Sequence, residues 1–314
     1  MLLDRRLLFV TGKGGVGKTA ITAALAHLAA TRGQRTLVCE VDAKGDLAEA
    51  FEAEPIAFRP REVMPGLWAM AMNTEESLRE YLALQLKLPL LARIGPLART
   101  FDFVANAAPG VKEILVVGKL CWEVRERHYD SVIVDAPASG HVVGQLAAPQ
   151  AIKELVKVGL VRGQTDWVLG ILGDAAQTGA VIVATPEEMP VTESIELAER
   201  LRQETVVDLA AVVVNRVLPE LFTRGEEEIF RSLRQPAYLA ALQAELGDPV
   251  TEVLDGADLA VKLRRTRAGH LAELRAGLPA DAELLYVPEL FQRSHGVRAT
   301  RQIAEALGAE LGYD

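Results

Sequence analysis

The stretch GKGGVGKT at residues 12–19 combines glycine, lysine and threonine in a spacing that suits the binding of phosphate. Glycines let backbone N–H groups close around phosphate oxygens, because no Cβ atom stands in the way. Lys18 can supply a full positive charge to the outer phosphates of a nucleotide, and Thr19 can offer its hydroxyl to Mg²⁺. The stretch follows a strand-like run and opens a helical pattern, which is the context that the motif G-x-x-x-x-G-K-[ST] requires. A glycine-rich turn without a ligand is the alternative.

Two aspartates end strand-like runs and carry the carboxylates that phosphate chemistry needs. Asp42 ends TLVCEVD, and a position beside the phosphate loop would let it orient or deprotonate the attacking water. A helix-capping aspartate is the alternative for this residue. Asp135 ends SVIVD, where a carboxylate can hold a water molecule of the Mg²⁺ shell. We therefore expect Mg²⁺ to bind through Thr19 and, by way of water, through Asp135.

An amide and a glycine complete the candidate site. Asn215 ends the run AAVVVN, and its side chain offers the donor and the acceptor that an adenine edge requires. A turn-forming asparagine is the alternative. Gly140, in DAPASGH, could bring its backbone amide to the γ-phosphate, where a side chain would obstruct the approach. The adjacent His141 is not expected to bind a metal, because the five histidines show no metal-ligand spacing.

The elements that must position these residues alternate between strands and helices. The apolar runs lack a clean alternation, which is typical of strands covered on both faces. They span residues 7–11, 36–42, 131–135, 180–185, 210–215 and 283–288, with a weaker candidate at 67–72. Helical patterns lie between most of them, including 18–32, 191–204 and 297–311. This order predicts an α/β fold with a doubly wound, mostly parallel sheet.

Two intervals, at about 73–130 and 144–178, have room for several helices and little sign of a strand. Asn73, followed three residues later by a glutamate, has the pattern of a helix start. We interpret both intervals as a helical subdomain inserted at one end of the sheet, within a single domain over residues 1–314. A further charged and helical segment, at 224–281, suggests no role.

The composition is that of a soluble globular protein with an acidic surface. Half of the residues are hydrophobic, a quarter are charged, and the formal net charge is −9, which argues against nucleic acid as a partner. The N-terminus lacks the long apolar region of a signal peptide, so we expect a cytoplasmic protein. The two cysteines, Cys39 and Cys121, form no CxxC pair. We expect buried thiols in a reducing compartment, and no zinc.

The second lysine of the loop, Lys13, is not required for phosphate binding, and a solvated loop lysine is one interpretation of it. The signature K-G-G-x-G-K-[ST], however, resembles that of the deviant-loop group of P-loop ATPases, which includes arsenical-pump, tail-anchored-protein-targeting, partitioning and division-site ATPases. The resemblance implies that Lys13 acts in catalysis across a dimer, on the partner subunit's phosphates, while Lys18 acts within its own subunit. The nucleotide-contacting residues that it implies in the loop are Gly12, Lys13, Gly14, Gly15, Val16, Gly17, Lys18, Thr19 and Ala20.

Two further segments are similar to the arsenical-pump and targeting branch of that group. The branch has the switch D-P-A-H-[NS]-L-x-x-x-F, of which this chain keeps Asp42, Leu47 and Phe51, with AKGD in between. The branch also has D-T-A-P-T-G-H, which DAPASGH resembles, so that Asp135 and Gly140 keep their positions. The resemblance thus implies Asp42 as the catalytic carboxylate.

The same resemblance implies that Asn215 reads the adenine and that Pro288, after the last strand, flanks the base. It implies an Mg²⁺- and ATP-dependent dimer, either a homodimer or a heterodimer with a paralogue, which couples hydrolysis to opening and closing around a client. Apolar helix faces around Leu115 and Leu155 would hold a hydrophobic helix of a membrane protein, and ordinary core or dimer contact is the alternative. A regulatory nucleotide switch and a partitioning or division-site ATPase are the other functions left open.

Overall fold

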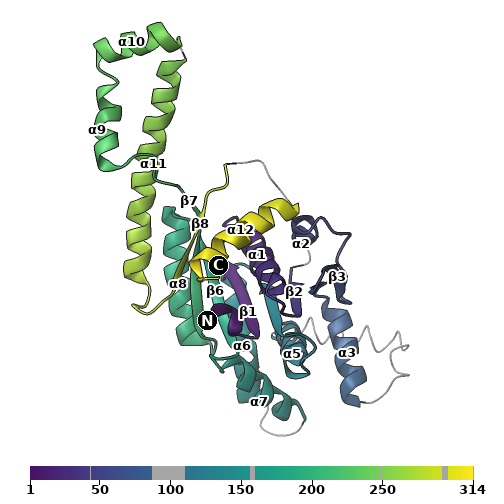
Figure 1. The fold of residues 1–314 in the computed structure, drawn as a ribbon. Coiled ribbons are helices and arrows are strands. Elements are labelled where there is room, and N and C mark those ends of the chain that lie inside the picture. Colours follow the sequence, from purple (N-terminus) through teal and green to yellow (C-terminus); the bar gives the residue numbers. More distant parts are fainter. Residues whose placement is uncertain (43, 87–109, 156–159, 248, 292–295, 314) are drawn as a thin grey trace.

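The computed structural model describes residues 1–314 except 43, 87–109, 156–159, 248, 292–295 and 314, and the chain forms an eight-stranded sheet. The strand order is β3-β4-β2-β5-β1-β6-β7-β8 (Figure 1). The bounds are β1 Leu7–Gly12, β2 Thr36–Glu40, β3 Arg61–Met64, β4 Leu67–Ala71, β5 Ser131–Asp135, β6 Thr178–Ala184, β7 Leu209–Val217 and β8 Leu284–Pro288. The β3–β4 pair is antiparallel, and every other neighbouring pair of this sheet is parallel. The predicted α/β fold with a mostly parallel sheet is confirmed.

One strand was not predicted from the sequence. All seven apolar runs are strands, but β3 is a further, four-residue strand at the edge of the sheet. Its residues are exposed or half-buried, so they lack the apolar run that identifies the others. β3 is joined to β4 by a tight turn in which Gly66 has a φ of +78°, a conformation that glycine adopts readily.

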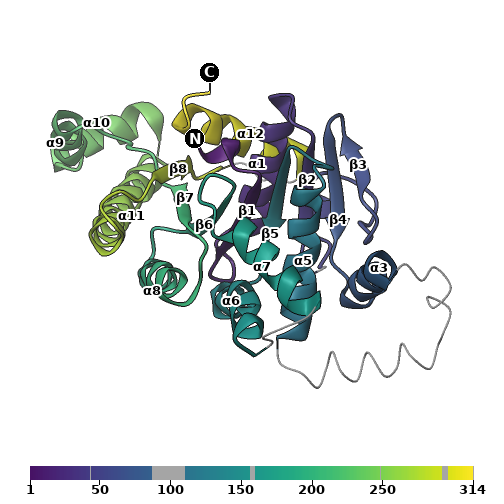
Figure 2. The ribbon, with the colours of Figure 1, turned by 90° about the horizontal axis from the view of Figure 1, so that it is seen from below.

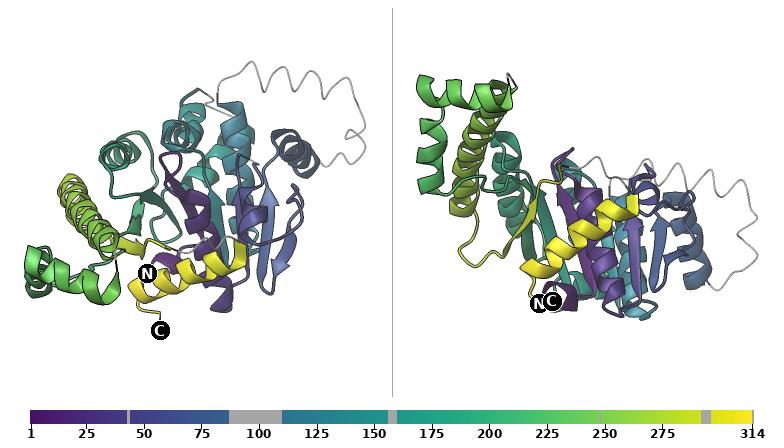
Figure 3. Two further views of the ribbon diagram at one scale, coloured as in Figure 1. Left: turned by 90° about the horizontal axis from the view of Figure 1, so that it is seen from above. Right: turned by 45° about the horizontal axis from the view of Figure 1, so that its top comes forward.

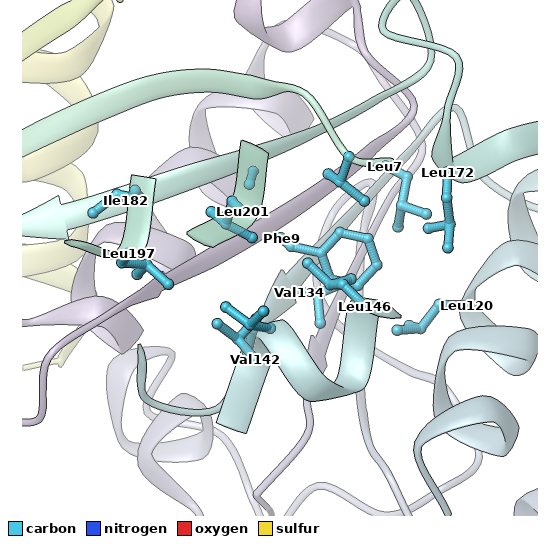
Figure 4. Close-up of a cluster of buried hydrophobic side chains, with 14 of the residues drawn as sticks. Leu7, Phe9, Leu120, Val134, Val142, Leu146, Leu172, Ile182, Leu197 and Leu201 are labelled. Atoms are coloured by element: carbon cyan, nitrogen blue, oxygen red, sulfur yellow. The ribbon is translucent and has the colours of Figure 1, made fainter. Parts of the chain in front are cut away.

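The sheet carries a hydrophobic core on each face, because successive side chains of a strand point to opposite sides. Leu7 and Phe9 of β1 belong to the first core, and Leu8 and Val10 belong to the second. All four side chains are fully buried. Figure 4 shows the first core around Phe9.

Helices cover both faces of the sheet (Figure 2). Among the helices that contribute to the first core are α5 Val111–Arg125, α6 Ser139–Leu155, α7 Leu160–Leu172 and α8 Glu188–Glu204. Those that contribute to the second are α1 Lys18–Thr31, α2 Asp46–Ala50 and α12 Gly296–Glu310. A short 3-10 helix, Leu2–Asp4, precedes β1. Helices therefore occupy both intervals that were interpreted as insertions, and α5 and α6 among them pack directly on the sheet.

Helix α3, Thr74–Leu86, packs against α5 beside the sheet. The Asn73 side chain accepts a hydrogen bond from the backbone N–H of Glu76 at 3.0 Å, which confirms the predicted helix start. Lys119 of α5 lies 2.6 Å from Glu80 of α3 and 2.6 Å from Glu123 of α5. Although burial opposes its charge, the hydrogen bonds to Glu123 and Glu80 raise the pKa of Lys119. This buried ionic cluster joins the two helices.

Both cysteines are free thiols in the first core. Cys39 on β2 and Cys121 on α5 are fully buried, and burial raises the pKa of both thiols far above its ordinary value. The expectation of buried thiols is confirmed.

An arm of three helices, residues 224–277, follows the end of β7 and leads back to β8. It consists of α9 Arg224–Ser232, α10 Pro236–Leu246 and α11 Val250–Gly277. Figures 1 and 3 show it extending well away from the sheet. Its base is anchored where Leu274 enters the first core and where Gly277 closely approaches Ile195 of α8. Towards its tip, α10 has no buried residue. Within the described residues, no helix has the length and apolar character that a bilayer crossing requires.

Candidate active site

A cavity of about 300 Å³ lies where β1, β2 and β5 end. Its lining residues are Gly14, Gly15, Gly17, Lys18, Thr19, Ala20, Glu40, Asp42, Lys44, Asp46, Asp135, Ala136 and Ala138. Ligands of parallel α/β sheets bind outside the carboxyl ends of the strands, and this cavity occupies that position. The folded chain thus brings most of the phosphate-loop residues together with both predicted carboxylates.

The phosphate loop has a backbone that requires glycine at two points. At Gly12, a Cβ atom would lie 2.2 Å from the carbonyl oxygen of Val183 on the neighbouring strand β6. At Gly17, which has a φ of +92°, a Cβ atom would lie 2.5 Å from the Asn215 side chain. The first turn of α1 follows directly at Lys18, so its free amides and its partial positive charge face the cavity. This combination is a general binding site for an anion.

Lys18 is held by its own loop. Its Nζ donates a hydrogen bond to the carbonyl oxygen of Lys13 at 3.2 Å. Burial lowers the pKa of Lys18, while the nearby carboxylate of Asp135 acts in the opposite direction. The ammonium group thus lies within the phosphate loop and near the Asp135 carboxylate, in a position to bind a phosphate.

Thr19 and Asp135 form a direct pair at the end of β5. The Thr19 hydroxyl donates to Asp135 Oδ2 at 2.7 Å, and the Thr22 hydroxyl donates to Oδ1 at 3.4 Å. Burial raises the pKa of Asp135 to about 6, against the opposing effects of the Thr19 hydrogen bond and the Lys18 charge. A hydroxyl and a buried carboxylate are oxygen donors of the kind that Mg²⁺ prefers, and a cation would relieve the cost of the buried charge. The two residues therefore fit an Mg²⁺ that completes its shell with water and phosphate oxygens.

Asp42 lies in the segment that follows β2. The strand ends at Glu40 and not at Asp42 as expected, because the chain turns towards α2 after Glu40. Asp42 is exposed and lines the cavity together with residues of the phosphate loop. Glu40 also lines the cavity, although it is buried, and the backbone of the following segment donates hydrogen bonds to its side chain. Sequence reasoning missed Glu40, and the available signal was a charged residue in an otherwise apolar run.

Lys13 is not among the residues that line the cavity, and its side chain reaches helix α8. Its Nζ lies 2.5 Å from Glu193 Oε1, and the Ser139 hydroxyl lies 3.5 Å from Glu193 Oε2. Lys13 is therefore neither a freely solvated lysine nor a residue that lines the cavity of its own chain.

Asn215, at the end of β7, is buried and touches the phosphate loop. Its side-chain amide donates to the carbonyl oxygen of Val16 at 2.9 Å, and its Oδ1 accepts the backbone N–H of Arg216 at 2.9 Å. Pro288 ends the neighbouring strand β8 and pairs with Val217. Both residues thus lie towards the carboxyl ends of their strands, on the side of the sheet where the cavity opens, but neither lines the cavity.

Gly140 is in the first turn of α6, close after the lining residues Ala136 and Ala138, and it is exposed. Its neighbour His141 is exposed as well. The structure thus places Gly140 next to the cavity but does not bring its amide into the lining.

The sequence matches the family model described as anion-transporting ATPase, over residues 5–166 and 161–247. ATPase BagA of Mycobacterium tuberculosis is 32% identical over 225 residues, which cover 68% of this chain and 66% of that protein. The putative arsenical pump-driving ATPase of Halobacterium salinarum is 28% identical over 294 residues, covering 87% of this chain and 44% of the relative. ATPase GET3 of Podospora anserina is 29% identical over 208 residues, covering 64% of this chain and 59% of the relative. The chain spans from under half to about two thirds of the length of these relatives.

Proposed function

Because the chain belongs to the anion-transporting ATPase family, we propose that it binds ATP together with Mg²⁺ in the cavity and hydrolyses the γ-phosphate. The observation that carries this proposal is the 2.7 Å hydrogen bond between Thr19 and Asp135. It joins the phosphate loop to the end of β5, in a cavity that Lys18 also lines, and so supports the proposal that both oxygens serve Mg²⁺. A glycine-rich turn that binds nothing has no need of a buried carboxylate at this point.

The side chains of the cavity would divide the chemistry between them. Lys18 and the loop amides would hold the β- and γ-phosphates. Thr19 would bind Mg²⁺ directly and Asp135 would bind it through water, and the ion would neutralise charge that develops on the phosphates. Asp42, which also lines the cavity, would orient the attacking water and accept its proton.

A second subunit would complete this site. Lys13 does not line the cavity of its own chain, and its flexible side chain would reach the phosphates held by a partner once it leaves Glu193. A cation supplied in this way stabilises the charge of the transition state. The partner would be a second copy or a paralogue, and nucleotide turnover would drive opening and closing of the pair. A cytoplasmic location belongs to this proposal and agrees with two free thiols.

The client of this switch would be a hydrophobic helix. Of the two apolar faces that suggested it, the one on α5 is partly core, because Val117 and Leu120 are fully buried. The other face keeps Leu155, at the end of α6, with 81% of its surface exposed. Residues 156–159 of that face lie outside the described residues. Leu155 is therefore the residue on which the client proposal rests.

The test of hydrolysis is Mg²⁺-dependent release of phosphate by the purified chain, with EDTA as the reference. Thr19→Val keeps the shape of the side chain and removes the hydroxyl that pairs with Asp135. We expect it to reduce turnover at least about 100-fold, as is usual when an oriented group of phosphoryl transfer is lost. Thr31→Val, at the exposed end of the same helix, is the matched control and should turn over like the parent. Equal turnover of Thr19→Val and the parent would remove the basis of the proposal.

A further inference from the structure

Glu40, the last residue of β2, is a carboxylate with 3% exposure at the edge of the candidate active site. Its Oε1 accepts hydrogen bonds from the backbone N–H groups of Lys44 at 3.2 Å, Gly45 at 3.0 Å and Asp46 at 3.1 Å. Its Oε2 accepts a further one from Gly45 at 3.2 Å. A buried carboxylate is costly unless it is paired or well hydrogen-bonded, so these amides are what allows Glu40 to be buried.

These hydrogen bonds close a ring in the chain, and Asp42 is one of its members. The backbone leaves β2 at Glu40, and four residues later it returns to the carboxylate of the same residue. Gly45 makes the return turn with a φ of +88°, in the left-handed region that favours glycine. Asp42 belongs to the segment between these two fixed points, so its position depends on Glu40 from both sides.

Glu40 is itself fixed by the centre of the sheet. Its backbone is level with Asp135 on β5 and with Ala71 on β4, and its carbonyl accepts the N–H of Met72 at 2.8 Å. Strands that are paired on both sides form the most rigid part of such a fold. The carboxylate therefore ties the Asp42 segment to the same frame that carries Asp135.

We propose that Glu40 is a positioning residue, which holds Asp42 in place at the cavity that the phosphate loop also lines. The inference rests on the proposed hydrolysis at this site and names a residue on which its rate depends.

The kinetic test compares Glu40→Gln and Glu40→Ala with the parent in steady-state hydrolysis of Mg·ATP. Glutamine keeps one acceptor oxygen and loses the charge, while alanine loses every acceptor. We expect kcat to fall about 10- to 100-fold in Glu40→Gln and further in Glu40→Ala, because misplacement by about 1 Å has that effect. The KM should stay within about 3-fold, because Lys18 and the loop amides bind the nucleotide. An unchanged kcat, or a loss that appears in KM alone, would overturn the proposal.

A double-mutant cycle separates positioning from a general loss of structure. If Glu40 acts through Asp42, then Glu40→Gln should cause no further loss of kcat in the Asp42→Asn background. Additive losses would mean that Glu40 acts by another route. Glu123→Gln is the control, since Glu123 is also a buried carboxylate in a hydrogen-bonded cluster, but on α5 and away from the cavity. We expect it to lower stability and leave kcat near that of the parent.

Amide hydrogen exchange tests whether Glu40 holds residues 44–46 in place, and it does not depend on hydrolysis. In the nucleotide-free protein, the amides of residues 44–46 should exchange faster in Glu40→Ala than in the parent, with no such change in Glu123→Gln. Equal exchange would refute the role of Glu40 even in an active enzyme. A parent chain that releases no phosphate would refute the proposed function. The exchange result would still show whether Glu40 holds residues 44–46 in place.

Discussion

The ammonium of Lys13 lies 2.5 Å from the carboxylate of Glu193 in the same chain. Both side chains are partly exposed, at 24% and 34%, so the pair is weak enough to separate. A lysine that acts across a dimer must leave such a partner first. The ion pair therefore opposes the proposed dimer, and this conflict can be measured.

Replacing Glu193 by glutamine should favour the dimer. The change removes the charge that holds Lys13, and a pair of this exposure contributes about 0.5–1 kcal/mol, which corresponds to a 2- to 5-fold tighter association. Sedimentation equilibrium with Mg²⁺ and a non-hydrolysable ATP analogue measures it. Glu196→Gln, an exposed glutamate on the same helix, is the control and should associate like the parent. Weaker association of Glu193→Gln would show that Glu193 supports the dimer instead.

Mixing two inactive variants should restore hydrolysis. Lys13→Ala and Lys18→Ala should each be inactive alone. In a mixed dimer, the site on the Lys13→Ala subunit keeps its own Lys18 and receives Lys13 from the partner. A cation supplied across an interface accelerates related reactions by ~10³–10⁵, so partial recovery is easily detected as phosphate release. Mixed dimers are verified with two affinity tags, and their continued inactivity would speak for Lys13 acting within its own chain.

Asp42→Asn should separate nucleotide binding from turnover. The amide fills the same space but cannot accept the proton of the attacking water, so we expect kcat to fall at least about 100-fold. Affinity for a fluorescent ATP analogue should remain within a few-fold of the parent. Turnover at the parent rate would exclude Asp42 as the catalytic carboxylate.

Asp135→Asn should stabilise the protein when neither Mg²⁺ nor nucleotide is present. The native pKa of about 6, against 3.8 for the ordinary group, means that folding favours the protonated form. This contribution to stability is complete below pH 3.8 and is lost progressively as the pH rises from there through 6. Ionised Asp135 then costs about 3 kcal/mol, which asparagine avoids.

Urea unfolding in EDTA measures this effect. The gain from Asp135→Asn should be larger at pH 8 than at pH 5 by about 1 kcal/mol. The same variant should lose Mg²⁺-dependent hydrolysis. A variant less stable than the parent at pH 8 would contradict the raised pKa.

Leu155→Glu should abolish capture of a hydrophobic helix and leave basal hydrolysis intact. The side chain is 81% exposed, so a charge there is tolerated in the folded chain and unfavourable in an apolar groove. The measurement is ATP-dependent binding of a synthetic transmembrane-helix peptide. Leu246→Glu, exposed at 68% in the arm, is the control. Equal capture by both variants would remove Leu155 from the client site.

The sequence predicted the sheet and most of the cavity lining because both depend on local patterns. The buried strands have apolar runs, and the phosphate loop has a motif of fixed spacing. The contacts that decide how the site works join distant parts of the chain. Lys13 meets Glu193 from 180 residues away, and Asn215 meets Val16 from 199 residues away. No local pattern specifies such pairs.

Two other features were outside the reach of the sequence for different reasons. β3 has no apolar run because it lies at an exposed edge. The sequence predicted that residues 224–281 are helical, but not that they extend away from the sheet. Helix α11 has no single apolar face and buries only Leu254 and Leu274, so its pattern does not indicate what it packs against. The assignment of roles to Gly140 and Pro288 stays a prediction.

Helix α11 has the length and the single-ended anchorage of a lever. Its 28 residues correspond to a rod of about 42 Å, with one end against Ile195 of α8 and the other at the tip of the arm. A tilt of about 5° at the base would therefore displace the tip by about 4 Å. Ile195 is two residues from Glu193, so the carboxylate that holds Lys13 and the fulcrum of the rod belong to the same turn of α8. A small shift of that turn would therefore displace the tip of the arm by about 4 Å, which is comparable to the length of a side chain.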